Sequence, residues 1–280
     1  MQQRFCSNIA IFAGNQGDNV VYYRNKYSRG DVMIGKLELK LKSQAELAYP
    51  MSSLFHGVLM ELLPAEYAEV LHISQLHPYA QHLAYRDGDW YWVVCCLNEE
   101  SVQKIIRDTL WDLKKIHIKK NDQDVTIVQK QYTETSTKDL MESFYSEDKD
   151  SYIQIHFISP TAFKQQGKYV FYPNLHCIFQ SLMNKYDAAA VKESMTDADT
   201  LESLEEGAEI IRYDLKSVKF PIEKVRIPAF IGKITIKMKG TQTMTNFAHM
   251  LFEFGEFSGV GIKTSLGMGC IKIMEERGKI

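Results

Sequence analysis

The chain lacks the features that would direct it to a membrane or to an oxidising compartment. Among its 280 residues there is no run of about 18 apolar residues, the length that a membrane-spanning helix needs. No basic segment followed by an apolar one stands at its start. Its five cysteines are an odd set without C-x-x-C spacing, which argues against a zinc site or a disulfide framework. We therefore expect a cytoplasmic protein without a membrane span or secretory leader.

The chain also lacks a broad excess of positive charge, because its formal net charge is −2. The charges are unevenly spread, however. Residues 212–240 hold eight Lys or Arg and two acids, whereas residues 187–209 hold eight acids and one Lys. A basic segment of this kind can bind a phosphate backbone locally. A solvated hairpin beside a solvated acidic helix would explain the same charges.

Apolar content is sufficient for a real core, at 45% hydrophobic and 24% charged residues, and the length suits one large or two ordinary domains. The first half reads as a strand, two helices, a hairpin, a helix and a closing strand or strands. This order, βαββαβ, is typical of a ferredoxin-like unit. The expected elements are strand 37–42, helices 52–63 and 66–71, strands 82–86 and 90–97, helix 99–111, and strands 116–118 and 125–129.

The same order then repeats, with a strand at 152–158, a helix at 175–186, basic strands at 213–220 and 225–238, a helix at 243–254 and a last strand at 262–274. We therefore predict an α+β protein of two tandem ferredoxin-like (RRM-like) domains, 33–132 and 151–280, joined by a polar linker at 133–150. Residues 1–32 show no hydrophobic period. We expect a non-native or disordered extension there, with Met33 as the natural start.

Two Gly-x-Gly pairs, at Gly259 and Gly261 and at Gly267 and Gly269, flank the sequence Ile-Lys-Thr-Ser-Leu. Glycine permits positive φ and close approach of the backbone to a ligand, so amides here could face an anion. The spacing fits neither a Rossmann nor a Walker loop. A strand-turn-strand with flexible joints would explain the same glycines. No cofactor motif and no carboxylate set suited to Mg²⁺ occurs, so we expect neither a cofactor nor a metal.

The segment from Gly255 to Ile273 resembles the glycine-rich signature of the CRISPR-associated RNA-processing endoribonucleases of the repeat-associated (RAMP) superfamily. Residues 215–217 and 223–228 look like the family member encoded with type III-A CRISPR systems. A looser similarity covers residues 54–60, Leu71-His72 and Pro78-Tyr79. In all, the resemblance extends over residues 37–274.

The resemblance implies metal-independent cleavage of CRISPR repeat RNA in the precursor transcript, giving guide crRNAs with 2′,3′-cyclic phosphate and 5′-hydroxyl ends. It places the catalytic histidine at His72, with His56 facing the same site; His77, Arg86 or Lys263 could stabilise the phosphorane. It also implies transient association with a type III effector complex. The predicted RNA-binding residues are Gly259, Gly261, Lys263, Thr264, Ser265, Gly267, Gly269, Lys216, Lys219, Lys224 and Arg226.

Each of these functional assignments has an alternative interpretation. A lone histidine at a helix end is often a surface cap, and His176 and His249 are expected to be structural. A non-catalytic RAMP subunit that binds guide RNA in an effector complex would share the fold and the loop. A metabolite-binding ferredoxin-like enzyme is disfavoured by the lack of a cofactor motif. The grouping of His72 with His56 and His77 favours the endoribonuclease.

Overall fold

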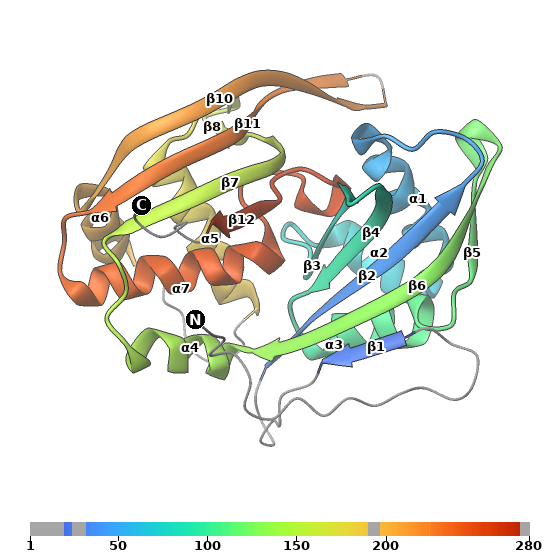
Figure 1. Ribbon diagram of the computed structural model, residues 1–280, viewed down its shortest axis with the longest axis horizontal. Coiled ribbons are helices and arrows are strands. Elements are labelled where there is room, and N and C mark those ends of the chain that lie inside the picture. The colour runs from blue at the N-terminus through green and yellow to red at the C-terminus, as the bar shows by residue number, and fades with distance from the viewer. Residues whose placement is uncertain (1–19, 24–31, 190–196, 224, 275–280) are drawn as a thin grey trace.

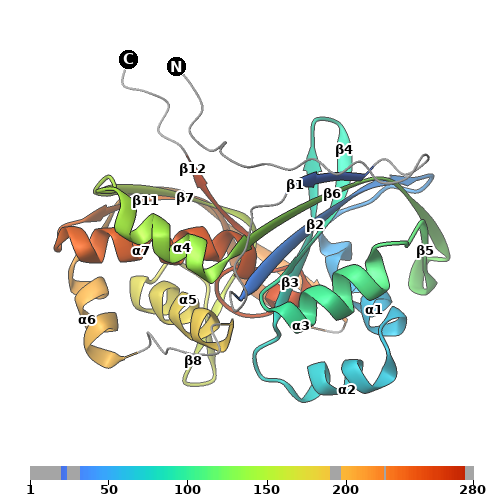
Figure 2. The same ribbon diagram turned by 90° about the horizontal axis from the view of Figure 1, so that it is seen from below.

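The computed structural model describes residues 20–23, 32–189, 197–223 and 225–274. Two large sheets, antiparallel except where β1 pairs with β6, lie side by side (Figure 1), each covered by helices on the same side of the molecule, beneath the sheets in Figure 2. Among the described residues, no helix has both the length and the apolar character needed to cross a membrane. The described cysteines are free and buried.

The N-terminal sheet has the strand order β1-β6-β2-β4-β3, with β5 paired to β6. Omitting β1 and β5, this is the antiparallel 4-1-3-2 order of a ferredoxin-like fold, which confirms the predicted class for this half. Helices α1, α2 and α3 cover the sheet, and α3 continues as a π-type helix over Val102–Leu110. The elements are β2 (Met33–Ser43), α1 (Ser52–Leu62), α2 (Ala65–Ile73), β3 (Tyr79–Arg86), β4 (Asp89–Cys96), α3 (Glu99–Ser101), β5 (Lys115–Ile118) and β6 (Gln123–Ser136).

The C-terminal sheet has the order β10-β11-β7-β12, which is the same topology again. The tandem arrangement predicted from the sequence is therefore confirmed. Helices α5 and α7 cover one face, where alternate residues of β7 are buried, while the other face of the sheet is open. The elements are β7 (Tyr152–Thr161), β8 (Phe163–Gln165), β9 (Lys168–Val170), α5 (Leu175–Ala189), α6 (Ala198–Glu206), β10 (Ala208–Ile222), β11 (Val225–Met238), α7 (Gln242–Ser258) and β12 (Ile271–Met274).

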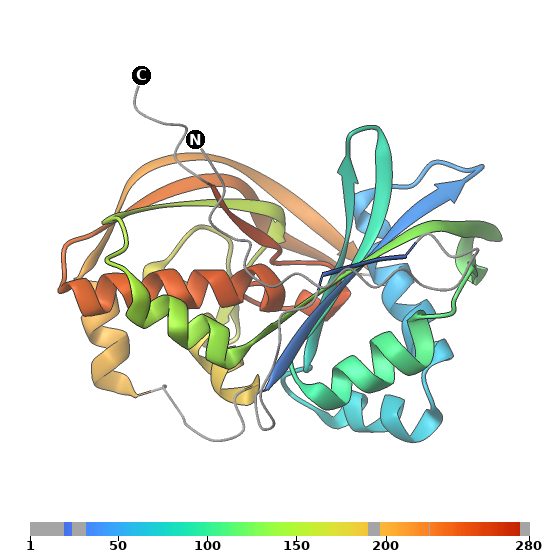
Figure 3. The same cartoon turned by 60° about the horizontal axis from the view of Figure 1, so that its bottom comes forward.

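The segment 133–150 was expected to be a polar linker, and the structure places regular elements there instead. β6 continues to Ser136, and α4 (Thr137–Ser146) follows at once. Ser136 and Asp139 form a reciprocal capping box, which fixes the start of the helix. The helix runs beside α7 (Figure 3) and buries Leu140 in the C-terminal core. Because this segment is mostly polar, its sequence did not indicate the amphipathic helix that the structure shows.

The predicted last strand, 262–274, is wrong over most of its length. Only β12, Ile271–Met274, is extended. The preceding residues form a loop because Lys263, Gly267 and Gly269 have positive φ angles of 59°, 106° and 74°, which a strand cannot contain.

The N-terminal segment holds one element that the sequence did not indicate. β1 (Val20–Tyr23) pairs in parallel with β6, from Val20 opposite Lys130 to Tyr23 opposite Thr133. The rest of the predicted extension, residues 1–19 and 24–31, lies outside the described residues. That residues 1–32 are an extension before a natural start at Met33 stays a prediction.

The two halves share one interior. Ile34 of β2 and Leu97, just after β4, are both buried in the core of the C-terminal half, although they belong to the N-terminal sheet. The ammonium of Lys36 lies 5.7 Å from the centre of the Phe257 ring at the end of α7. Because apolar side chains cross the junction, we expect the halves to unfold together.

Leu97→Ala should lower the free energy of unfolding by roughly 2–5 kcal/mol, the usual cost of truncating a buried leucine. All three tryptophans, Trp90, Trp92 and Trp111, lie in the N-terminal half. Their fluorescence therefore reports one half, while far-ultraviolet circular dichroism reports both. We expect the two urea transitions to coincide and to shift together in the variant. Leu62→Ala, at a leucine that is 41% exposed, is the matched control. Two separated transitions would contradict a shared interior.

Candidate functional site

The glycine-rich loop, residues 259–270, connects α7 to β12 and lies at the junction of the two halves. A Cβ at Gly261 would lie 2.3 Å from the carbonyl oxygen of Ala162, and one at Gly269 would lie 2.1 Å from that of Val260. No side chain fits at such distances, and both glycines have positive φ. The glycines are thus required for the loop to pack against its own protein.

The amides of the four glycines are already used inside the protein. Gly261 N donates to Ser181 Oγ at 2.8 Å and Gly269 N donates to Pro160 O at 3.0 Å. Gly259 N and Gly267 N donate to the carbonyls of Gly255 and Thr264. The expectation that these amides face an anion is therefore wrong for this conformation. A role of the glycines in RNA binding stays a prediction, through the loop shape that they permit.

A buried glutamine holds the loop against the N-terminal half. The Nε2 of Gln81, on β3, donates to the carbonyl oxygens of Ser52 at 2.8 Å and Ser265 at 2.9 Å. Its Oε1 accepts a hydrogen bond of 2.9 Å from the indole of Trp92. Gln81 is 1% exposed, so loss of its amide would leave the Trp92 indole N–H buried without its partner and would remove one donor from each of the two carbonyls. One side chain thereby fixes the start of α1, β4 and the 3₁₀ turn of the loop, Thr264–Leu266.

A buried lysine holds the other end of the loop. Lys185 of α5 donates to the carbonyls of Ser258 at 3.3 Å and Gly259 at 3.1 Å, and to Thr264 Oγ1 at 3.4 Å. A cation at these carbonyls stabilises the C-terminus of α7. Burial lowers the pKa of Lys185 to about 7. The sequence analysis missed this residue, although its spacing of three from Leu182 and seven from Ile178 places it on the buried face of the helix.

Three histidines of the N-terminal half lie beside this loop. The ring of His56, on α1, stacks on Tyr79 with 6.3 Å between centroids, and its Nδ1 is 2.9 Å from the Tyr79 hydroxyl. The His77 ring is 6.3 Å from that of His56 and 5.6 Å from that of Tyr79. His72 is exposed at the last turn of α2. We define His56, His72 and His77 as the histidine cluster.

The imidazoles of His56 and His77 are neutral at neutral pH. Burial lowers the pKa of His56 to about 4, and the charges of His77, His72 and Lys263 act in the same direction, while a hydrogen bond to the backbone of Ser265 opposes them. Burial also lowers the pKa of His77, followed by the charges of Lys263 and His72. Burial raises the pKa of the Tyr79 hydroxyl far above its usual value, so this hydroxyl keeps its proton. The cluster therefore offers neutral imidazoles that can accept a proton.

One ring nitrogen of His77 is a candidate contact for a ligand. Its Nδ1 is buried and has no hydrogen-bond partner among the described residues. Buried polar atoms in folded proteins nearly always have a partner, so such an atom is a candidate contact for a ligand. The sequence analysis grouped His77 with His56 and His72, and in the structure its ring lies 6.3 Å from that of His56.

A groove of about 360 Å³ begins at His56. Helix α1 forms one wall, Lys119 and Lys120 of the turn before β6 another, and Glu223 at the tip of the β10–β11 hairpin a third. Lys119 forms an ion pair of 2.8 Å with Glu61, so the basic turn is fixed to α1. The groove thus runs from His56, one member of the histidine cluster, to the two lysines of this turn.

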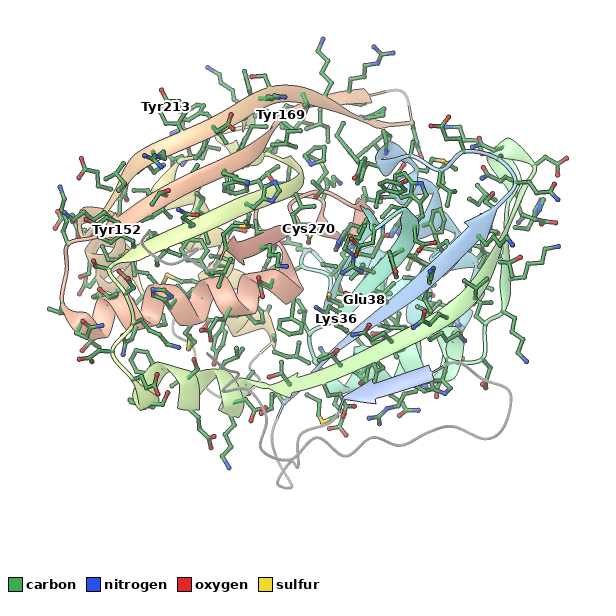
Figure 4. The ribbon with its side chains drawn as sticks, viewed as in Figure 1. Lys36, Glu38, Tyr152, Tyr169, Tyr213 and Cys270 are labelled. Atoms are coloured by element: carbon green, nitrogen blue, oxygen red, sulfur yellow. The ribbon has the colours of Figure 1, made fainter. Side chains whose placement is uncertain are left out.

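Arg86, a candidate for stabilising charge, lies elsewhere. Its guanidinium pairs with Glu38 at 2.7 Å and lines a second groove of about 320 Å³ between the open faces of the two sheets. Lys36, Glu38 and Cys270, which also line that groove, are gathered at the junction in Figure 4. Lys263 is the cation whose charge reaches His56 and His77.

The basic residues predicted on the β10–β11 hairpin do not form one patch. Lys219 is opposite Pro228 and Arg226 is opposite Pro221, so both share one face of the hairpin. Lys216, opposite Ile231, is on the other face. Lys224 lies outside the described residues. Contact of these basic residues with RNA stays a prediction. Among those described, only Lys219 and Arg226 share a face and could bind the same stretch of RNA.

The arrangement can move protons next to an anion without a cofactor. Neutral imidazoles accept protons, the Tyr79 hydroxyl orients His56, and Lys263 supplies positive charge from the loop. Among the described residues no group of three or more His, Cys, Asp or Glu could hold a metal ion. Two ferredoxin-like halves, with a glycine-rich loop set against a histidine cluster at their junction, define a RAMP-type protein.

Comparison with known proteins agrees with this class and narrows it. The family model of the CRISPR-associated endoribonuclease Cas6 matches residues 155–271. A Cas6 endoribonuclease of Streptococcus thermophilus is 39% identical over 243 residues, covering 86% of this chain and 99% of that protein. One of Mycobacterium tuberculosis is 32% identical over 222 residues, covering 78% of this chain and 70% of that protein. The chain belongs to the Cas6 family.

Solved structures show the same fold at lower identity. A Cas6 product complex has a TM-score of 0.72 at 20% identity, covering 87% of this chain and all of the other. Thermus thermophilus Cas6 has a TM-score of 0.67, again at 20% identity, covering 87% of this chain and 99% of the other. A Cas6-related protein of Pyrococcus furiosus has a TM-score of 0.56 at 14% identity, covering 89% of this chain and all of the other.

Gln81→Leu should lower the free energy of unfolding by about 2 kcal/mol, because it leaves the Trp92 indole N–H buried without its partner and removes one donor from each of two carbonyls. Chemical denaturation in urea measures the loss. Gln180→Leu, at an exposed position of α5, is the matched control and should change stability by no more than about 0.5 kcal/mol. Equal effects of the two substitutions would show that Gln81 does not hold the junction.

Stability should fall as the pH is lowered from about 6.5 towards 4. The pKa of His56 is lowered to about 4 in the folded protein, so the unfolded chain binds the proton first and acid favours unfolding. At pH 5 this one group should cost on the order of 1–2 kcal/mol. Urea midpoints at pH 7.5 and 5 should differ less for His56→Gln than for the natural protein. Gln180→Leu, an exposed substitution that removes no titratable group, is the control and should keep the natural pH dependence.

Proposed function

We propose that this protein is a metal-independent endoribonuclease that cleaves CRISPR repeat RNA in the precursor transcript to release guide crRNAs. Membership of the Cas6 family supports the substrate. The observation that supports the chemistry is that His56 lines the groove beside α1, with the His77 ring 6.3 Å away and with His72 and Lys263 close enough for their charges to lower the pKa of His56. The proposed association with a type III effector complex, of the III-A kind, rests on the sequence resemblance alone.

The reaction needs a proton acceptor, a proton donor and stabilised charge. The 2′-hydroxyl loses its proton to a base and attacks the adjacent phosphorus, the O2′–P bond forms, the P–O5′ bond breaks, and an acid protonates the departing O5′. The products are a 2′,3′-cyclic phosphate and a 5′-hydroxyl. His56, neutral and oriented by Tyr79, suits the base. His72, exposed at the last turn of α2, suits the acid.

The phosphorane requires positive charge close to the reacting phosphate. Lys263 is exposed and lies on the 3₁₀ turn of the loop, near enough for its charge to lower the pKa of both His56 and His77. We assign it this role in place of Arg86. His77 is a further candidate for contact with the phosphate, because its Nδ1 has no partner among the described residues.

The RNA would follow the groove that begins at His56. Lys119 and Lys120 line it, and the hairpin tip closes it from the C-terminal half. The solved neighbours include a Cas6 product complex and a Cas6 substrate mimic complex, as well as a RAMP protein binding different RNA substrates. By this analogy both halves of the present chain contact one RNA. The predicted domains 33–132 and 151–280 and the cytoplasmic location belong to the same proposal.

Cleavage of the cognate repeat RNA should proceed in EDTA and should stop when the 2′-hydroxyl at the scissile nucleotide is replaced by hydrogen. The natural protein should leave a cyclic phosphate and a 5′-hydroxyl. His72→Ala and His56→Ala should each slow single-turnover cleavage by roughly 10²–10⁴-fold, the range for loss of a general acid or base. RNA affinity should change little, because one imidazole adds little to an interface of many phosphates.

His249→Gln, at a histidine of α7 that lies outside the cluster and does not line the groove, is the control and should cleave as the natural protein does. A 3′-hydroxyl with a 5′-phosphate would indicate metal-type hydrolysis and overturn the mechanism. Tight binding without any cleavage would favour the alternative, a non-catalytic RAMP subunit of an effector complex. Normal cleavage by His72→Ala would move the acid to His77.

A further inference from the structure

A small hairpin, β8–β9, has no counterpart in the predicted fold and projects from the C-terminal half. Its two-residue turn, Gln166-Gly167, has positive φ at both positions, 46° and 79°, which is the geometry of a tight type I′ turn. At its base, Phe163 is buried against Phe230 with ring centroids 6.4 Å apart. The hairpin is therefore a defined element fixed to the core.

The exposed side chains of this hairpin are aromatic and basic. Tyr169 is 38% exposed, and Phe171 and Tyr172, which follow β9, are 43% and 59% exposed. Lys164, opposite Tyr169 in the register, and Lys168 are exposed and form no ion pair among the described residues. From residue 162 to residue 186 the sequence contains no Asp or Glu. We call Lys164, Lys168, Tyr169, Phe171 and Tyr172 the hairpin platform.

The platform is coupled directly to the glycine-rich loop. Ile262 N donates to the carbonyl oxygen of Ala162 at 3.0 Å, so the residue before β8 is bonded to the residue before Lys263. In Figure 2 the hairpin and α2, which carries His72, project to the same side of the molecule, one from each half. The hairpin is therefore bonded at its base to the loop that carries Lys263.

The neighbouring surface continues the positive charge. β9 contacts β11, and Tyr169 lies by the β10–β11 ribbon in Figure 4. Lys219 and Arg226 share the face of β10–β11 that also carries Phe230, against which Phe163 of the hairpin packs. Lys219 and Arg226 thus lie on the same side of β10–β11 as the hairpin platform.

We propose that the hairpin platform binds an unpaired segment of the repeat RNA next to the scissile phosphate. Exposed aromatic rings interleaved with unpaired lysines fit single-stranded nucleic acid, because the bases stack on the rings and the ammonium groups bind the phosphates. The absence of acidic residues from 162 to 186 favours a polyanion over a protein partner. This inference rests on the proposed function, and it adds a binding site outside the glycine-rich loop and the basic strands.

Binding is tested with repeat RNA carrying 2′-deoxy at the scissile nucleotide, so that it is not cut, and measured by fluorescence anisotropy. Tyr169→Ala and Tyr172→Ala should each weaken binding by roughly 5- to 150-fold, the range for loss of one stacked base. Tyr169→Phe should bind as the natural protein does. Lys164→Ala and Lys168→Ala should each lower the slope of log affinity against log salt by about 0.7, the value for one contact with single-stranded phosphate.

Two controls define the site. Tyr145→Ala removes a tyrosine that is 76% exposed on α4, away from the hairpin, and should leave binding unchanged. A fully paired repeat stem without flanks should bind the natural protein and Tyr169→Ala equally. At saturating RNA, single-turnover cleavage by Tyr145→Ala should match the natural rate.

Natural affinity in Tyr169→Ala and Tyr172→Ala would overturn the proposal and leave the platform to a protein partner. An equal loss with the paired stem would also overturn it, because the site would then bind duplex. Cleavage by the natural protein distinguishes these outcomes from failure of the proposed function. If the natural protein cuts repeat RNA and the tyrosine variants bind it normally, the platform alone is rejected.

Discussion

The site depends on one buried amide. Gln81 accepts from Trp92 and donates to the carbonyls of Ser52 and Ser265, and none of these groups can reach water. Because an unpaired buried polar group is costly, the N-terminal sheet, the start of α1 and the glycine-rich loop hold one relative position. Gly267 reinforces this position, since a Cβ there would lie 2.2 Å from the Cβ of Ser52. The junction between the halves is therefore set by polar pairing and close contact as well as by apolar packing.

That junction also determines the protonation of the site. His56 lies where α1, β3 and the loop meet, and its burial is what lowers its pKa most. Lys263 reaches the same place only because the loop is held there, and its charge works against protonation of both buried histidines. The same contacts thus produce a neutral proton acceptor and a cation within one small region. An RNA phosphate is the kind of group that such a pair can hold and activate.

The net charge of this protein does not show where its positive and negative residues lie on the surface. The net charge is −2. The basic residues of the β10–β11 hairpin divide between its two faces. The sequence around the β8–β9 hairpin, residues 162–186, contains no Asp or Glu. Acidic residues concentrate in and around α6, where Glu205 pairs with His176 and Glu209, at the start of β10, pairs with Lys239. A polyanion that avoids the acidic residues around α6 finds positive charge at Lys263 of the loop and at Lys164 and Lys168 of the hairpin platform.

The sequence by itself determined the fold class, because the alternation of hydrophobic residues in 152–158 and the helical spacing in 99–111 are local signals that survive packing. It also determined the family, through the spacing of Gly259, Gly261, Gly267 and Gly269. It could not reveal α4, whose polar residues concealed a capping box and a single buried leucine. The membership of the site was decided only by tertiary structure. Gln81 and Lys185 become functional neighbours of Ser265 and Thr264 across 184 and 79 residues of sequence, and no local pattern records such a contact.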